Sequence, residues 1–400
     1  MKIFFETFGC RLNRAGALQE EARYLAAGHT LAESHKEADI IVIRACSVTR
    51  RAQFDCEKLI SHLTRKYPLK KIFIQGCIQK NKLTPRHVQE RYLAESPDGT
   101  EPIPQKTARA YLKIQDGCNC KCTFCIVPSF RGRSVSIEST ALLDKAKRFI
   151  DAGYHEIVLT GCNLSLYASN GKSLVDIASD IADISSDCRI RIGSVEPGPL
   201  ASKLVDLMAG KDNICKFLHL SIQSGSAKIL SLMGRRYSLD DVESVCSAAV
   251  RKIPFLGLGA DMISGFPDEK DHDFMQSVNL VQKFPFTNLH SFPYSERPGT
   301  IAATLPGAVE RDIRRRRAYE LAAIAAKKRE KFCTSLIGKE VEIVVEKNSS
   351  LSGWTSQYLP FKSSAGNTKT DTDLRKQLIK VKVTRVENST LVGKRSANGR

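Results

Sequence analysis

Three cysteines in one short loop have the spacing of iron–sulfur ligands. Cys118, Cys122 and Cys125 form a C-x3-C-x2-C pattern directly after a predicted strand. Thiolates are the ligands that iron–sulfur clusters need. Three thiolates can hold three irons of a cubane cluster, and the fourth iron then stays open to a small chelating molecule. The spacing therefore predicts a [4Fe-4S] site with one open iron.

A fourth cysteine in the same loop, Cys120, permits a different metal. Four cysteines within so short a segment could bind zinc, and the chain would then be a zinc-stabilised RNA-binding protein without catalysis. Zinc sites usually combine two C-x2-C-like pairs from separate turns. The iron–sulfur interpretation is therefore favoured, while zinc and purely structural cysteines remain the alternatives.

A second set of cysteines follows the predicted strands of the N-terminal region. Cys10, Cys46 and Cys77 each lie one or two residues beyond such a strand. All strand carboxyl ends of a parallel sheet share one edge, so these three thiols can meet there. Gly9 and Gly76 precede two of them and permit close backbone approach. A second three-thiolate site is one interpretation, and three unrelated buried cysteines are the other.

Composition excludes a disordered chain and suits a polyanionic partner. Apolar residues make up 42% of the 400 residues, and the formal net charge is +18. Such a charge favours nucleic acid, although it can also serve solubility alone. Apolar runs fall short of the roughly 20 residues of a membrane span, and Glu6 interrupts the N-terminal apolar stretch. We expect a cytoplasmic protein, whose 13 cysteines then indicate metal binding or catalysis.

The elements that must position these cysteines form three units. Residues 1–93 read as a small parallel α/β domain, 94–107 as a linker, 108–333 as a partial (β/α)6 barrel and 334–400 as an all-β barrel. The predicted strands are 2–8, 39–45, 71–76, 111–115, 156–161, 189–195, 217–222, 256–263, 288–294, 340–346 and 378–386. The predicted helices include 15–27, 51–66, 140–152, 239–252 and 311–331.

Motifs along nearly the whole chain resemble those of the radical S-adenosylmethionine methylthiotransferases. The matching segments, in the family's order, are 7–13, 46–49, 76–77, 113–118, 122–128, 131–133, 160–161, 194–197, 219–225, 233–237, 265–267 and 292–300. Residues 337–339 and 358–360 resemble the RNA-binding TRAM domain. The closest resemblance is to the bacterial subgroup that thiomethylates N6-threonylcarbamoyladenosine in tRNA, on 46–49 and 115–117.

The resemblance implies a reaction at an unactivated C–H bond. Such a reaction needs a radical, and the cofactors must supply it. The resemblance also implies two [4Fe-4S] clusters, one on Cys118, Cys122 and Cys125 that cleaves S-adenosylmethionine, and an auxiliary one on Cys10, Cys46 and Cys77 that delivers the sulfur. The implied substrate is the tRNA anticodon loop, with N6-isopentenyladenosine or a ribosomal-protein aspartate as alternatives. An electron donor and a sulfur source are implied partners, and we expect a monomer.

Further roles follow from matching positions. The predicted cofactor-binding residues are Phe124, Gly161, Glu196, Gln223 and Gly265. The predicted RNA-binding residues are Arg314, Arg315, Arg316, Arg317 and Lys339. The chain departs from the family pattern at Arg44, Ala45, Gln79, Cys162, Ser165 and Asp268. These departures leave all six predicted ligands in place, but they bear on substrate choice and loop geometry.

Overall fold

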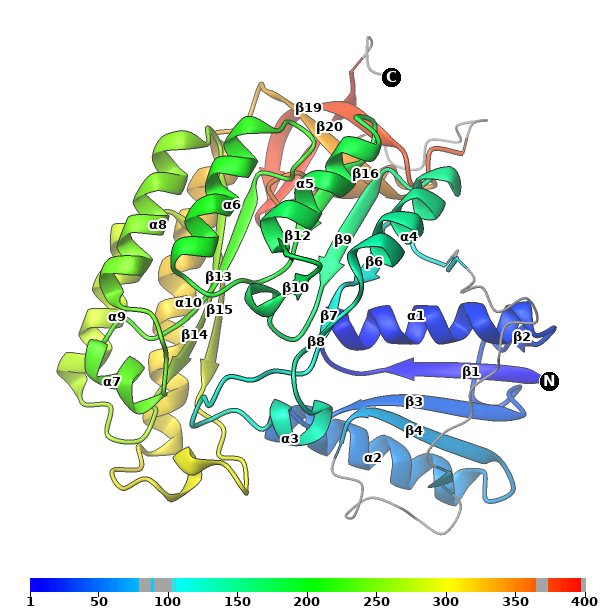
Figure 1. The fold of residues 1–400 in the computed structure, drawn as a ribbon, viewed down its shortest axis with the longest axis horizontal. Coiled ribbons are helices and arrows are strands. Elements are labelled where there is room, and N and C mark those ends of the chain that lie inside the picture. Colours follow the sequence, from blue (N-terminus) through cyan, green and yellow to red (C-terminus); the bar gives the residue numbers. More distant parts are fainter. Residues whose placement is uncertain (79–87, 90–102, 105, 365–372, 397–400) are drawn as a thin grey trace.

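The computed structural model describes residues 1–78, 88–89, 103–104, 106–364 and 373–396. In this part of the chain a parallel α/β unit, a partial barrel and a closed β barrel follow one another (Figure 1). Most of the predicted linker, 94–102 and 105, lies outside the described residues. Within the described ranges, no helix has both the length and the apolarity that crossing a membrane requires.

The N-terminal unit is a five-stranded parallel sheet in the order β2-β1-β3-β4-β5. Its strands are β1 (Lys2–Thr7), β2 (Thr30–Leu31), β3 (Ile40–Cys46), β4 (Lys71–Cys77) and β5 (Val88–Gln89), and its helices are α1 (Arg11–Ala26) and α2 (Arg50–Lys66). Alternate residues of β3 pack on opposite faces: Ile41 and Ile43 join the core that includes α2, while Ile40 and Val42 pack with Tyr24 of α1. Because all five strands run parallel, their carboxyl ends lie at one edge of the sheet.

Six parallel strands form the partial barrel. They are β6 (Ala110–Lys113), β9 (Glu156–Thr160), β12 (Arg189–Ile192), β13 (Phe217–Gln223), β14 (Gly257–Ser264) and β15 (Phe286–Pro293). The strands pair as β12-β9-β6 and β13-β14-β15, and the isolated bridge between Val195 and Leu220 joins the two halves. All six predicted strands are therefore present, and none of their ends is shifted by more than three residues.

Helices cover the outer face of this barrel (Figure 1). They are α4 (Ser139–Asp151), α5 (Leu174–Ile184), α6 (Pro199–Gly210), α8 (Leu239–Lys252), α9 (Asp271–Lys283) and α10 (Arg311–Thr334). Leu218, Leu220 and Ile222 of β13 pack into the core shared with these helices. Because side chains alternate along a strand, Phe217, His219 and Ser221 face the barrel lumen instead.

The C-terminal unit is a closed barrel with the strand order β16-β17-β18-β20-β19. Its strands are β16 (Glu340–Lys347), β17 (Ser352–Thr355), β18 (Pro360–Ser363), β19 (Leu378–Glu387) and β20 (Thr390–Arg395). Alternate residues such as Ile343, Val345 and Phe361 fill its interior. Closure removes the exposed edges that an open sheet of this size would leave.

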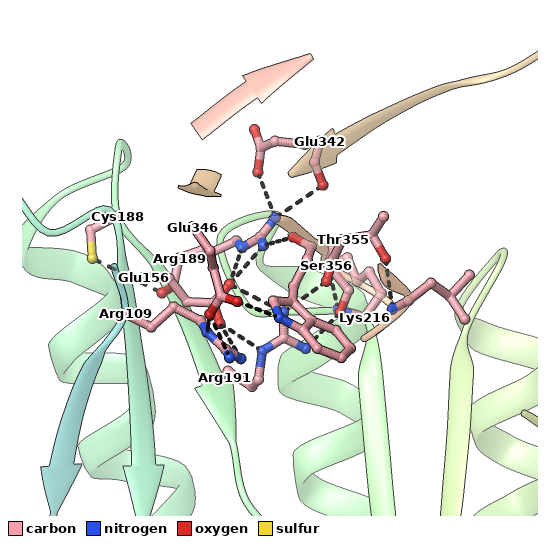
Figure 2. Close-up of polar contacts among 12 residues, drawn as sticks. Arg109, Glu156, Cys188, Arg189, Arg191, Lys216, Glu342, Glu346, Thr355 and Ser356 are labelled. Atoms are coloured by element: carbon pink, nitrogen blue, oxygen red, sulfur yellow. Dashed lines mark hydrogen bonds and ion pairs between the residues drawn. The ribbon is translucent and has the colours of Figure 1, made fainter. Parts of the chain in front are cut away.

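A buried ionic network docks this closed barrel against the amino ends of the partial-barrel strands. Glu156, which is fully buried at the start of β9, accepts hydrogen bonds from Nε of Arg189 at 2.7 Å and Nε of Arg191 at 2.8 Å (Figure 2). Arg191 also donates to the backbone oxygens of Thr355 and Ser356, at 2.8 and 3.0 Å. The carboxyl ends of the strands, where such folds place their chemistry, therefore stay clear of the closed barrel.

Candidate functional site

The loop after β6 carries the first cysteine set and is held at both ends. It runs from the short strand β7 (Gln115–Asp116) to the short helix α3 (Val127–Arg131). Gly117 has a φ of +70°, and a Cβ there would lie 2.0 Å from the Arg133 carbonyl oxygen, so only glycine fits this approach. Thr123 donates from Oγ1 to the Leu232 carbonyl at 2.7 Å. The loop conformation is thus set by contacts outside it.

The fully buried Gln115 organises the start of this loop. Its Nε2 donates to the Gly117 carbonyl at 2.6 Å, and its Oε1 accepts from the Asn163 backbone nitrogen at 3.0 Å. A Cβ on Gly161 would lie 2.9 Å from the same Oε1. Gly161 therefore leaves room for the Gln115 carboxamide, which is a packing reason for a glycine predicted to contact a cofactor.

Polar groups surround the sulfurs of the first set. Arg235 donates to Sγ of Cys122 at 3.2 Å and pairs with Glu196 at 3.0 Å. Hydrogen bonding with the Cys120 thiol lowers the pKa of the Cys118 thiol and of the Cys122 thiol to about 6. Burial instead raises the pKa of the Cys125 thiol to about 11. Ready ionisation of thiols favours metal coordination, because the thiolate is the ligand.

The second set lies at one edge of the N-terminal sheet. Cys46 and Cys77 are register partners at the ends of β3 and β4, and Cys10 caps the N-terminus of α1. Burial raises the pKa of the Cys46 thiol, and the nearby Cys77 and Cys10 sulfurs raise that pKa further. Gly9 has a φ of +89°, and a Cβ there would lie 2.8 Å from Sγ of Cys46. The glycine therefore keeps space free beside that sulfur.

Both sets fit the donor requirement of a [4Fe-4S] cluster. All six cysteines are free thiols, three on each set of loops and strand ends. Cys10 is exposed whereas Cys46 and Cys77 are buried, so the second set opens toward solvent on one side. Three thiolates and an open side match a cluster that keeps one iron for another ligand.

Arg131 at the end of α3 joins the two sets. It donates from Nε to Sγ of Cys77 at 2.8 Å and from Nη1 to Asp116 at 3.0 Å. Its Nη2 donates to Oδ1 of Asn13 at 2.7 Å, and Asn13 in turn donates to the Ala45 carbonyl at 2.8 Å. The helix that follows one cysteine loop is thereby bound to the strand ends that carry the other cysteines.

The remaining predicted cofactor residues have mixed surroundings. Glu196 lies beside the first set, since its Oε1 is 3.9 Å from Sγ of Cys120. Gln223 ends β13 with a φ of +73°. Phe124 packs against a small core that includes Phe266 and Tyr294. A Cβ on Gly265 would lie 2.3 Å from Cγ of Arg314, so α10 packs directly against this glycine.

The structure corrects the predicted RNA-binding stripe on α10. Arg314 and Arg317 are buried, and they pair with Glu296 and Glu269 at 2.9 and 2.8 Å. Buried, paired guanidinium groups are not available to phosphates, so the prediction is wrong for these two residues. The remaining predicted residues, Arg315, Arg316 and Lys339, are exposed.

Three of the departures from the family pattern make specific contacts in the structure. Arg44 pairs with the buried Glu20 at 3.0 Å. Sγ of Cys162 lies 3.3 Å from Oδ1 of Asp116, and Oγ of Ser165 accepts from the Glu196 backbone nitrogen at 2.9 Å. Asp268 has a φ of +63°, a conformation that glycine adopts at lower cost. Gln79 lies outside the described residues.

Sequence reasoning misses four residues that organise the site: Gln115, Arg131, Asn163 and Arg235. Gln115, Arg131 and Arg235 lie within the matched motifs, and this position was the only sequence signal for their roles. Asn163 carries no such signal, although its Nδ2 lies 3.5 Å from Sγ of Cys120. Some of their partners are distant, since Asn163 contacts Cys120 and Arg131 contacts Asn13, 43 and 118 residues away along the chain, and no local pattern could identify such contacts.

Comparisons with known proteins agree on the class of fold and protein. Residues 112–281 match the family model described as the radical SAM superfamily, and residues 2–92 match that of the uncharacterized protein family UPF0004. The Aquifex aeolicus threonylcarbamoyladenosine tRNA methylthiotransferase MtaB is 29% identical, over 90% of this chain and 96% of its own length.

Two further comparisons cover most of the chain. The tRNA-2-methylthio-N(6)-dimethylallyladenosine synthase of Chloroherpeton thalassium is 30% identical, over 87% of this chain and 86% of its own length. The solved structure of the radical S-adenosylmethionine methyltransferase TsrM from Kitasatospora setae has a TM-score of 0.54 at 11% identity, over 76% of this chain and 77% of that chain. At this identity the structural match shows the fold alone.

Proposed function

The chain belongs to the radical S-adenosylmethionine methylthiotransferases, and we propose that it inserts a methylthio group at C2 of N6-threonylcarbamoyladenosine in tRNA. It is an enzyme whose cofactors are S-adenosylmethionine and [4Fe-4S] clusters. The observation that carries the proposal is the contact of Arg131 with Cys77 and Asp116, because it brings two three-cysteine sets onto adjoining elements. Sulfur insertion with two clusters requires such a juxtaposition.

In this proposal each cysteine set holds one cluster. Cys118, Cys122 and Cys125 would hold the cluster that supplies the electron for S-adenosylmethionine cleavage, and Cys10, Cys46 and Cys77 would hold the one that supplies the sulfur. Arg235 balances negative charge at the first set through its contact with Cys122. Arg131 does the same at the second set through Cys77. The proposed radical reaction uses no side chain as a catalytic acid or base.

The lining of the lumen supports the threonylcarbamoyl substrate over a dimethylallyl one. His219, Ser221, Asp261 and His290 lie together on the inner faces of β13, β14 and β15. A threonylcarbamoyl group carries a carboxylate and a hydroxyl that polar side chains can contact, whereas a dimethylallyl group is apolar and offers them no hydrogen bond. The name of the Aquifex aeolicus relative also supports this substrate.

RNA binding in this proposal uses the closed C-terminal barrel as a TRAM domain, together with exposed cations. Arg315, Arg316 and Lys339 are exposed, and the chain carries a net charge of +18. Lysine and arginine side chains that contact phosphates supply most of the sequence-independent affinity for RNA. A target base in a single-stranded anticodon loop can be splayed out of its stack and taken into a site. A tRNA substrate also implies a cytoplasmic enzyme.

Nucleoside mass spectrometry of tRNA from a strain that lacks the gene tests the substrate. We expect 2-methylthio-N6-threonylcarbamoyladenosine to disappear and the unmodified precursor to accumulate, with recovery on complementation by the wild-type gene and not by a Cys118→Ala variant. If the methylthio form of dimethylallyladenosine disappears instead, the substrate assignment is wrong. If only a methylthio-aspartate of a ribosomal protein is lost, tRNA is not the substrate.

A further inference from the structure

Three potential metal ligands converge in the lumen of the partial barrel, apart from the cysteines. They are His219 on β13, Asp261 on β14 and His290 on β15, and one ligand atom from each lies within 4.8 Å of the others. Nε2 of His219 is 3.1 Å from Oδ1 of Asp261, and Nδ1 of His290 is 3.0 Å from the same oxygen. Neighbouring strands of one parallel sheet therefore supply two imidazoles and a carboxylate that point to a common space.

The buried imidazole is the observation that singles out this cluster. The His219 side chain is only 5% exposed, yet its Nε2 has no partner in hydrogen-bond geometry among the described residues. Leaving a buried polar atom without a well-formed hydrogen bond is unfavourable. A metal ion between this nitrogen and the Asp261 oxygen would satisfy both atoms.

The local backbone is shaped to hold the imidazole in this place. A Cβ on Gly259 would lie 2.5 Å from Nδ1 of His219, so a glycine is needed for the ring to lie over β14. The second carboxylate oxygen of Asp261 accepts a hydrogen bond from Oγ of Ser221 at 3.5 Å. Metal-ligating carboxylates are commonly oriented by such a second contact.

We propose that His219, Asp261 and His290 form a binding site for a divalent transition-metal ion. Ligands about 2.1 Å from an ion in tetrahedral geometry are roughly 3.4 Å from one another, and the two nitrogen–oxygen distances here are within a few tenths of an ångström of that. Two imidazoles and one carboxylate suit Zn²⁺, Fe²⁺ or Mn²⁺ and leave coordination positions open. The His290 side chain is 45% exposed, so water or a small ligand can reach the open positions.

Binding of Mn²⁺ to the reconstituted enzyme tests this site. Mn²⁺ is the probe because it prefers nitrogen and oxygen ligands to thiolates, and loss of its aqueous EPR signal counts bound ions while the oxidised clusters are EPR-silent. We expect one bound Mn²⁺ per chain, with at least tenfold weaker binding in Asp261→Asn and His290→Ala. His290 is partly exposed, so its replacement leaves the packed side of the barrel intact.

Two comparisons decide the outcome. The matched control is His272→Ala, which removes an exposed imidazole 3.5 Å from the Asp273 carboxylate and should bind Mn²⁺ like the wild type. Anomalous diffraction recorded between the manganese and iron absorption edges should show a peak at the three side chains. If Asp261→Asn and His290→Ala both bind Mn²⁺ like the wild type, or if that peak is absent, the three residues form only a hydrogen-bonded group. Neither measurement needs tRNA or turnover, so failure here leaves the methylthiotransferase proposal standing.

Discussion

The Nε of Arg131 lies 2.8 Å from the Sγ of Cys77, although the two residues belong to different units of the chain. The same guanidinium pairs with Asp116, two residues before the first cysteine of the barrel loop. Burial raises the pKa of the Cys77 thiol, and the positive charge of Arg131 opposes that effect. One side chain therefore both connects the cysteine sets and stabilises negative charge on one of them.

Replacing Arg131 should change the electronic properties of the cluster held by Cys77. We expect Arg131→Met to lower its reduction potential by about 60 mV, a tenfold change for a one-electron couple, because hydrogen bonds and charge near the sulfurs set such potentials. An EPR-monitored redox titration measures the shift. Arg133→Met, which removes an exposed arginine of the same segment, is the control. Equal potentials in the wild type and in Arg131→Met would contradict the proposed role.

Iron analysis of cysteine variants should distinguish the predicted cluster ligands from the neighbouring Cys120. The two-cluster assignment corresponds to about eight irons per chain after anaerobic reconstitution. We expect Cys118→Ala to lose about half of the iron and Cys120→Ala to keep nearly all of it, because Cys120 lies outside the three-cysteine pattern. Equal loss in both variants, or stoichiometric zinc in the wild type, would favour a four-cysteine zinc site.

Loss of the buried carboxylate at the barrel interface should destabilise the protein. Removing one partner of a buried ion pair costs about 3–5 kcal/mol, so Glu156→Gln should lower the free energy of unfolding by that amount in denaturant titrations. Glu342→Gln is the matched control, because Glu342 pairs with the same Arg189 but is 43% exposed, and an exposed pair contributes about 1 kcal/mol or less. Similar losses in both variants would contradict the importance of burial.

The contribution of Glu156 should also depend on pH. Burial opposes ionisation of this carboxyl, but Arg191 and Arg189 outweigh that effect and hold its pKa well below the ordinary value of 4.5. A lowered pKa in the folded state means that the stabilisation is complete above the unfolded pKa and is lost as pH falls below it. The stability difference between wild type and Glu156→Gln should therefore be constant from pH 7 to about 5.5 and shrink at lower pH. A stability difference that grows as the pH falls would contradict a lowered pKa of Glu156 in the folded protein.

Exposed arginines on α10 should contribute to RNA affinity, unlike the buried ones. We expect the double variant Arg315→Ala/Arg316→Ala to bind tRNA more weakly and to reduce the salt dependence of log K by about one unit per lost phosphate contact. Fluorescence anisotropy at several salt concentrations measures both. The control is Arg251→Ala/Lys252→Ala, which removes two exposed cations at the end of α8. If both pairs weaken binding equally, α10 has no specific role.

The sequence alone predicted most of the longer strands and several of the helices, and it singled out both cysteine sets as predicted cluster ligands. The reason is that these signals are local: the C-x3-C-x2-C spacing lies within one loop, and Cys46 and Cys77 stand at the ends of apolar runs that had to become buried strands. Apolar alternation also indicated the β-rich C-terminus, which the structure shows as a closed barrel.

Tertiary structure decided which side chains meet across those elements. Arg131 contacts Cys77 and Asn13, which lie 54 and 118 residues away along the chain. Arg314 and Arg317 are buried because they pair with acidic side chains. His219, Asp261 and His290 come together because β13, β14 and β15 pair side by side, with Asp261 opposite His290 and His219 opposite Gly259. Such contacts depend on the packing of whole elements, whereas the sequence pattern around each residue reports only its nearest neighbours along the chain.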